Sequence, residues 1–276
     1  MLLTLAASSL RSKLWLKPGK PAAGTMPLRD LPRHARESLG LHGLNISTEL
    51  LAGADLPRLD EFRDAADKAG CPCLVLIRPD PLPLFASDDK KGDDAIARMT
   101  RVVQAAHRLG CNSAALFIAP DPGDSEDDAF DLAAERLRKI MSVAEKREVN
   151  LLIGSSRGPT AEPDRLTDLI KRVGGFRIGT FPDYQTAAAA PDPLTYLRRL
   201  SPYASAVTAS TIGFKVTKKG VEHQGYDLVD FTKAVIAVGY TGTLAIDYRG
   251  DGDVDEGIRH SRAVLESVIG VEGNDT

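Results

Sequence analysis

The chain has little aromatic content, few histidines and no strong excess of charge of either sign. Aromatic residues make up 5% of its 276 positions, histidines number five, and the formal net charge is −3. A nucleic-acid-binding domain gathers lysine and arginine into a strongly basic surface. Acidic and basic residues are interspersed here, so the sequence predicts that nucleic acid is not a partner.

Long hydrophobic runs are also missing. Crossing a membrane takes about 20 consecutive apolar residues, whereas the apolar segment 1–10 is soon followed by Arg11 and Lys13. No basic residue precedes this segment, as one would in a secretory signal. We therefore interpret it as a first β-strand, with a cleaved signal as the less favoured alternative, and we expect no membrane partner.

Cysteine is scarce, with only Cys71, Cys73 and Cys111 in the chain. Each falls near the start of a predicted strand, and reduced, buried thiols of this kind are typical of cytoplasmic proteins. A metal clip built on Cys71 and Cys73 would need further soft ligands nearby in the sequence, and none is evident. The sequence therefore predicts a cytoplasmic location.

What the sequence does contain is a regular alternation of short β-like runs with longer segments of helical period. Apolar residues recur at helical spacing in positions such as Ile96, Met99 and Val103, and charged residues occupy the opposite face. The predicted strands are 2–8, 41–47, 73–78, 113–119, 149–154, 176–183, 205–210 and 243–248.

Repeated strand–helix units imply parallel strands joined by helical crossovers, in either an open sheet or a closed barrel. Eight units, in a chain near the roughly 250 residues of a typical barrel, favour closure. An open doubly wound sheet usually has a glycine-rich loop after its first strand, and residues 6–10 contain no glycine. The sequence thus predicts a single α/β domain over 1–276, a (β/α)8 TIM barrel, with no nucleotide cofactor.

In such a barrel the functional face is formed by the loops that follow the strands. Asp183 ends the sixth predicted strand and Asp247 lies near the end of the eighth. Two carboxylates from nearby strands could share a divalent cation, or divide into an acid and a base. The alternative is that Asp247 simply pairs with Arg157 or Arg249.

Other polar side chains at this face suit sugar hydroxyls or anions. Because side chains alternate along a strand, Thr208 and Ser210 share one face of their strand, as do Asp247 and Arg249. The Gly-Ser-Ser-Arg-Gly segment at 154–158 could surround a phosphate or carboxylate with backbone donors and one guanidinium. The predicted substrate-binding residues are Asn45, Arg78, Ser155, Arg157, Thr208, Ser210, Lys215 and Arg249.

Only one histidine, His223, lies in a predicted loop of this face. The loop, residues 212–225, also carries Lys215, so it could close over an anionic substrate and supply His223 as an acid, base or ligand. The alternative is a solvated loop with no such role. The predicted catalytic residues are therefore Asp183, Asp247 and His223.

Two segments are the most specific parts of a family resemblance that covers nearly the whole chain. They are Gly-Phe-Arg-Ile-Gly-Thr-Phe-Pro-Asp at 175–183 and Gly-Tyr-Thr-Gly-Thr-Leu-Ala-Ile-Asp-Tyr-Arg-Gly at 239–250. With the order of the remaining segments, they resemble the xylose-isomerase-like TIM-barrel superfamily, which includes sugar phosphate isomerases and epimerases. The resemblance implies a divalent metal held by residues that end strands five to eight, with two glutamates as the acid–base pair.

At the four implied ligand positions this chain has Gly154, Asp183, Thr208 and Asp247. Half of the implied ligands are absent, and two carboxylates alone hold a divalent ion weakly. The resemblance therefore implies a divergent sugar (phosphate) isomerase- or epimerase-like barrel acting on a small carbohydrate or polyol. Binding of Mn²⁺ or Mg²⁺ by Asp183 and Asp247 stays open, as does assembly into a homo-oligomer.

Two further functions stay open at this stage. The first is a degenerate barrel that binds a carbohydrate-like ligand or a partner without turnover, which the missing ligand positions favour. The second is a metal-free lyase or hydrolase that uses Asp183 and Asp247, since a fold alone does not settle chemistry.

Overall fold

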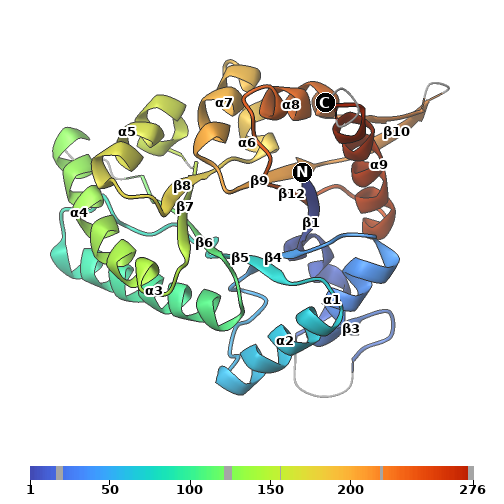
Figure 1. The fold of residues 1–276 in the computed structure, drawn as a ribbon, viewed down its shortest axis with the longest axis horizontal. Helices are drawn as coiled ribbons and strands as arrows, with labels where there is room; N and C mark the ends of the chain where they lie inside the picture. Colours follow the sequence, from blue (N-terminus) through green and yellow to red (C-terminus); the bar gives the residue numbers. More distant parts are fainter. Residues whose placement is uncertain (17–20, 121–125, 156, 218–219, 273–276) are drawn as a thin grey trace.

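Eight parallel strands form the core of the computed structural model, and the helices lie outside them (Figure 1). The structure describes residues 1–16, 21–120, 126–155, 157–217 and 220–272. Hydrogen bonds connect the strands in the order β8-β7-β6-β5-β4-β1-β12-β9. These strands are β1 (Leu2–Ala6), β4 (Leu44–Ser47), β5 (Cys73–Ile77), β6 (Ser113–Phe117), β7 (Asn150–Gly154), β8 (Ile178–Phe181), β9 (Ala206–Thr211) and β12 (Thr243–Tyr248).

Seven strands lie within their predicted segments and β9 extends one residue beyond its own, to Thr211, so the parallel α/β sheet expected from the sequence is confirmed. The outer strands of this order, β8 and β9, are also related by two isolated parallel bridges. One joins Thr180 to Ala204 and the other joins Asp183 to Thr208. The segment after β8 is thereby held beside β9.

Helical segments follow the strands. The main ones are η1 (Ala7–Lys13), α1 (Leu31–Arg33), α2 (Leu56–Lys68), α3 (Asp89–Arg108), α4 (Glu126–Glu145), α5 (Pro163–Val173), α6 (Tyr184–Ala188), α7 (Pro193–Leu200), α8 (Leu228–Ile236) and α9 (Val254–Glu272). Aspartate begins many of them, because its side chain accepts a hydrogen bond from a free backbone N–H of the first turn. Asp55, Asp88, Asp192 and Asp227 do so for α2, α3, α7 and α8.

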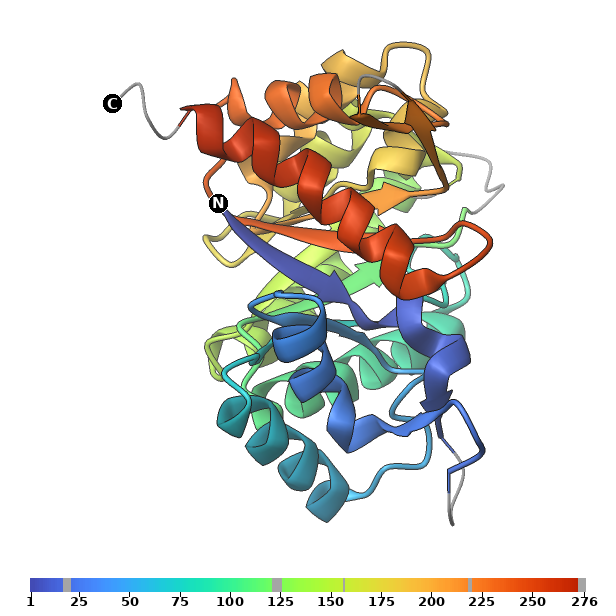
Figure 2. The same ribbon diagram turned by 90° about the vertical axis from the view of Figure 1, so that its right-hand side faces the viewer.

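The side view in Figure 2 shows α9 lying across the outside of β12, the strand that pairs with β1. Two smaller strand pairs lie apart from the main sheet: β2 (Leu14–Trp15) with β3 (Met26–Pro27), and the antiparallel hairpin of β10 (Phe214–Thr217) with β11 (Gly220–His223). No helix in the described ranges is long and apolar enough to cross a membrane.

The sheet buries apolar side chains on both of its faces. The outer face packs against the helices through residues such as Leu5, Leu116 and Ile246. The inner face holds a separate, smaller cluster of Val75, Ala115, Leu152, Phe181 and Ala206. Since side chains alternate along a strand, the inner face also carries Thr4, Asn45, Thr208 and Asp247, which are all buried.

The three cysteines are buried free thiols, as predicted. Burial, together with the neighbouring Cys73, raises the pKa of Cys71 to about 12. A buried thiol with so high a pKa is unreactive, since the thiolate is the nucleophile.

Candidate functional site

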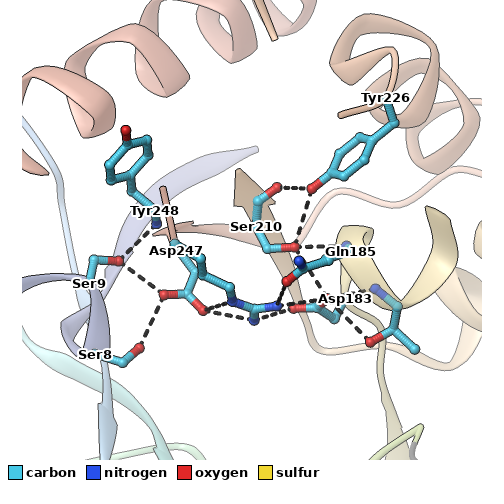
Figure 3. A network of polar contacts seen from close by, with 10 residues as sticks. Ser8, Ser9, Asp183, Gln185, Ser210, Tyr226, Asp247 and Tyr248 are labelled. Atoms are coloured by element: carbon cyan, nitrogen blue, oxygen red, sulfur yellow. Dashed lines mark hydrogen bonds and ion pairs between the residues drawn. The ribbon is translucent and has the colours of Figure 1, made fainter. Parts of the chain in front are cut away.

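Asp247 lies on β12 with its side chain directed to the inner face of the sheet, where it is 7% exposed. Its Oδ1 atom accepts hydrogen bonds from Ser8 Oγ at 3.1 Å and from Ser9 Oγ at 3.0 Å (Figure 3). Both serines belong to η1, which follows β1, the neighbour of β12. Ser9 Oγ also accepts a hydrogen bond from the Tyr248 N–H at 2.9 Å. The segment after β1 therefore holds both this carboxylate and the backbone of β12 next to it.

Asp183 follows β8 and begins the short helix α6. Its Oδ1 atom accepts from the Thr186 N–H at 2.9 Å and from Ser210 Oγ at 3.2 Å. Ser210 Oγ in turn accepts from the Gln185 N–H at 2.8 Å. The helix start and the end of β9 therefore fix the orientation of this carboxylate.

Arg249 joins the two carboxylates. Its Nη2 atom lies 2.6 Å from Asp183 Oδ2 and 2.8 Å from Asp247 Oδ2, and its Nε donates to Asp247 Oδ2 at 2.8 Å. Its Nη1 donates to Gln185 Oε1 at 2.8 Å and to Asp183 Oδ1 at 3.3 Å. A guanidinium has five N–H groups; four hydrogen bonds go from this one to Asp183, Asp247 and Gln185, and its Nη2 also forms a close ion pair with Asp247 Oδ2.

We call Asp183, Arg249 and Asp247 the Asp–Arg–Asp cluster. Two carboxylates and one guanidinium give it a formal charge of −1. Burial opposes the charged form of Arg249, but the charges and hydrogen bonds of the two aspartates outweigh it and raise the arginine's pKa. The side chain of Arg249 is 37% exposed, against 15% for Asp183 and 10% for Asp247, so solvent reaches the cluster from the arginine side.

One acceptor position in this cluster stays open. Asp247 Oδ1 accepts hydrogen bonds from both serines, and its Oδ2 accepts one from Arg249 Nε and also lies against Arg249 Nη2. Asp183 accepts at Oδ1 from several donors, whereas among the described residues its Oδ2 contacts only Arg249 Nη2. A carboxylate oxygen can accept about two hydrogen bonds, so Asp183 Oδ2 is the oxygen best able to meet a ligand.

These residues do not fit a divalent metal ion. Within the described ranges, no group of three or more His, Cys, Asp and Glu side chains converges closely enough to hold one. At Gly154, an added Cβ would lie 2.2 Å from Cε1 of Phe117, so an aromatic ring fills the space that a ligand side chain would need. Catalytic metal sites draw three or more protein ligands, and the two predicted here, Asp183 and Asp247, are both bound to Arg249.

Tyr226 and Gln185 belong to the site although the sequence analysis did not single them out. The Tyr226 hydroxyl donates to the backbone oxygen of Ser210 and lies 3.4 Å from the hydroxyl of the same residue. Burial, and to a lesser extent the charge of Asp183, raises the pKa of Tyr226 to about 12. The signal available in the sequence was the Gly-Tyr-Asp at 225–227, in the loop that contains His223.

His223 is bound to backbone rather than to the cluster. Its Nε2 accepts from the Ile212 N–H at 3.0 Å, and its Nδ1 lies 2.9 Å from the Tyr226 carbonyl oxygen. An accepting Nε2 and a donating Nδ1 correspond to the neutral ring. Burial lowers the pKa of His223, which also favours the neutral form. In the contacts of the described residues, His223 is therefore linked to the cluster through Tyr226 and Ser210.

The remaining predicted residues divide between the inner face and other places. Thr208 is on the inner face beside Asp183. Asn45 is 1% exposed there, and neither atom of its amide has a hydrogen-bond partner in the described part of the chain. Ser155 Oγ donates to the Thr160 carbonyl oxygen at 2.8 Å, so its hydroxyl serves the loop after β7.

Arg78, Lys215 and Arg157 are not brought to the cluster by the contacts the structure describes. Arg78 lines a separate pocket with Arg98 and Arg101 of α3, and Lys215 lies on the β10–β11 hairpin opposite Glu222. Arg157 lies in the loop after β7, and its neighbour Ser156, part of the predicted anion-binding segment, lies outside the described residues.

Residues 35–268 match the family model of the xylose isomerase-like TIM barrel. The chain therefore belongs to this family. The match covers most of the sequence, including both aspartates and the arginine of the cluster.

Solved structures agree in fold at low sequence identity. D-psicose 3-epimerase from Clostridium cellulolyticum H10, solved with D-tagatose, has a TM-score of 0.74 and 15% identity, over 98% of this chain and 99% of that one. The 3-keto-D-glucoside 4-epimerase of E. coli has a TM-score of 0.72 and 14% identity, over 97% and 99%. A xylose isomerase-like TIM-barrel protein from Mycobacterium smegmatis, in complex with magnesium, has a TM-score of 0.67 and 17% identity, over 98% of this chain and 97% of that one. No curated protein matches this sequence significantly.

Proposed function

We propose that this protein is a sugar isomerase- or epimerase-like enzyme that acts on a small, uncharged carbohydrate or polyol without a bound metal. The observation that carries the proposal is the Asp–Arg–Asp cluster at the carboxyl ends of β8 and β12, in a chain of a family whose solved relatives include sugar epimerases. We further propose that the bridges between β8 and β9 close the sheet into one barrel domain.

The charge of the site favours an uncharged ligand. The cluster has a formal charge of −1, which repels a phosphate, and Arg78 and Lys215 do not offset this charge because they lie elsewhere. Buried polar side chains on the inner face, among them Asn45 and Thr208, suit hydroxyl groups. A neutral sugar therefore fits better than a sugar phosphate.

Isomerisation moves a proton from a carbon beside a carbonyl to its neighbour. We assign Asp183 as the base, because its Oδ2 has an open acceptor position. The proton passes from the substrate carbon to this oxygen, and the electron pair moves onto the carbonyl oxygen to give an enediolate. The proton of the neighbouring hydroxyl then moves to that oxygen, and Asp183 returns its proton to the former carbonyl carbon. Epimerisation instead returns a proton to the opposite face of the original carbon, which requires Asp247 to enter the reaction protonated as the donor; the two carboxyl groups then recover their starting states by proton exchange with water.

Arg249 has two roles in this proposal, because it positions both carboxylates and contacts the substrate. Among the described residues, the uncharged side chain that its guanidinium meets is that of Gln185, which is exposed. A substrate oxygen that replaces Gln185 at Nη1 would receive a charge-assisted hydrogen bond as negative charge develops on it. Neither aspartate has to lose its partner for this exchange.

Binding without turnover is the second candidate. Its supporting observation is that both oxygens of Asp247 already have partners and that each nitrogen of the Arg249 guanidinium donates at least one hydrogen bond within the protein. A network so complete is also what a purely structural cluster would have. The buried free thiols support the predicted cytoplasmic location for either candidate.

The test is incubation of the EDTA-treated protein with D-fructose, D-tagatose and D-psicose in D₂O, followed by proton NMR. We expect deuterium to enter at the carbon beside the carbonyl, and Asp183→Asn to abolish this exchange. Asparagine is the matched control, because it caps a helix as well as aspartate does and so leaves α6 in place. Saturable binding with no exchange would favour the non-catalytic candidate, and no binding of any of these sugars would contradict both.

A further inference from the structure

We propose that Arg249 is a built-in cation: its guanidinium occupies the point between Asp183 and Asp247 where a divalent metal ion would bind, and so keeps metal out of the resting protein. The proposal concerns the folded protein without substrate, and it does not depend on turnover.

The geometry places one nitrogen where both carboxylates converge. Asp183 follows β8 whereas Asp247 lies on β12, and their Oδ2 atoms lie 2.6 and 2.8 Å from the same Nη2 atom of Arg249. Divalent cations bind carboxylate oxygens at about 2.0–2.6 Å. A metal ion that bridged these two oxygens would therefore overlap the nitrogen, so the guanidinium and the metal exclude each other.

The rest of the protein holds Arg249 in this position. Its backbone N–H donates to the Thr211 carbonyl oxygen at 2.7 Å, which ties it to the end of β9. The next residue, Gly250, passes so close to β9 that an added Cβ would lie 2.2 Å from the Ile212 carbonyl oxygen. The backbone is therefore held at Arg249 and at the residue after it, which fixes the position from which the arginine side chain extends to the two carboxylates.

A metal ion would gain too little to displace the arginine. It would have to break all five contacts of the guanidinium, and in return it would gain two carboxylates. Within the described residues no third carboxylate, imidazole or thiolate joins them; the nearby oxygens of Gln185 and Thr208 are uncharged, and the ring of Phe117 fills the space beside Gly154. Removing the arginine reverses this balance, since two neighbouring carboxylates left without a cation repel each other.

The experiment measures Mn²⁺ binding by calorimetry and by its effect on Tm. The variants are Arg249→Met, which removes the charge but keeps much of the side chain's bulk, and Arg249→Lys, which keeps the charge. We expect no binding to the wild type or to Arg249→Lys up to millimolar Mn²⁺. For Arg249→Met we expect a Kd for Mn²⁺ at least tenfold below the highest concentration at which the wild type shows no binding, and a rise in Tm when Mn²⁺ is added. Adding Asp183→Asn to Arg249→Met should abolish both effects.

Two results would overturn the proposal. The first is micromolar Mn²⁺ binding to the wild type that is lost in the Asp183→Asn, Asp247→Asn double variant. The second is an Arg249→Met protein that is folded by circular dichroism but binds Mn²⁺ no better than the wild type. If Arg249→Met does not fold, Arg249→Gln replaces it under the same criteria, because glutamine keeps amide donors for one of the carboxylates.

Discussion

The two halves of the sheet's inner face are filled in different ways. On β5 to β8 most of the inner side chains are apolar, with Val75, Ala115, Leu152 and Phe181 packed together. On β1, β4, β9 and β12 small apolar side chains alternate with several buried polar or charged groups, and the segment after β8 adds Asp183 to this side. Packing holds the side chains of the apolar half together, whereas hydrogen bonds and the guanidinium shared by two aspartates hold those of the polar half.

This contrast explains why the implied metal site is incomplete. Its four positions span both halves: Gly154 ends β7 in the apolar half, and Asp247 is in the polar half. Phe117 pairs in register with Gly154 and fills the apolar end. The two remaining acidic positions then need another source of positive charge, and Arg249 supplies it from within the chain.

The largest expected effect is on the polar half. Arg249→Met leaves two largely buried carboxylates without a cation, so we expect a loss of about 2–4 kcal/mol in the free energy of unfolding. Breaking a fully buried pair costs about 3–5 kcal/mol, and the arginine is 37% exposed, which reduces the effect. Urea denaturation measures it. An effect below about 0.5 kcal/mol would show that the cluster adds no more than a surface ion pair.

The next effect is on the apolar half. Gly154→Ala forces a Cβ against the ring of Phe117, and overpacking of this kind costs about 1–3 kcal/mol. Phe117→Leu should relieve the clash, so the double variant should be more stable than the sum of the two single changes predicts. Thermal denaturation of the three variants checks this. Strict additivity would mean that the ring does not occupy this space.

A third variant replaces a buried polar side chain of the polar half by an apolar one. Asn45→Leu replaces a buried amide with no described partner by a hydrophobic side chain of similar size, so we expect stability to rise by up to about 1 kcal/mol. Sugar binding should weaken at the same time. A clear loss of stability would contradict this account, because it would mean that the amide is satisfied in the folded protein.

The smallest expected effect is a pH dependence at the edge of the polar half. Burial lowers the pKa of His223 below its ordinary value of 6.5. Near pH 6 the unfolded chain therefore binds more protons than the folded one, so the stabilisation that is present above pH 6.5 is lost as the pH falls. Comparison of Tm between pH 8 and pH 5.5 should show a weaker decline for His223→Gln than for the wild type. Equal declines would indicate that the ring titrates normally.

The sequence was sufficient for the parallel sheet of eight strands and for the placement of Asp183 and Asp247 at its carboxyl edge. Eight β-like runs alternating with helical segments predicted the eight strands, and the period of two along a strand placed Asp247 and Arg249 on one face. The alternative in which Asp247 pairs with Arg249 is what the structure contains. The same alternation applied to β5 would have shown that Arg78 faces away from the inner face, because Val75 and Ile77 point to it.

The remaining parts of the site depend on contacts that no local pattern encodes. Ser8 and Ser9 reach Asp247 across more than two hundred residues because β1 pairs with β12. Phe117 meets Gly154 only through the register of β6 and β7. Sequence reasoning could name the residue types at each strand end, but not which neighbours would engage them.

The most direct test of the central claim is a crystal structure of the protein grown with millimolar MnCl₂ and measured at a wavelength that reveals manganese by anomalous scattering. We predict the guanidinium of Arg249 between Asp183 and Asp247, with no anomalous peak there. A manganese peak bridging the two carboxylates, with Arg249 turned away, would contradict the account.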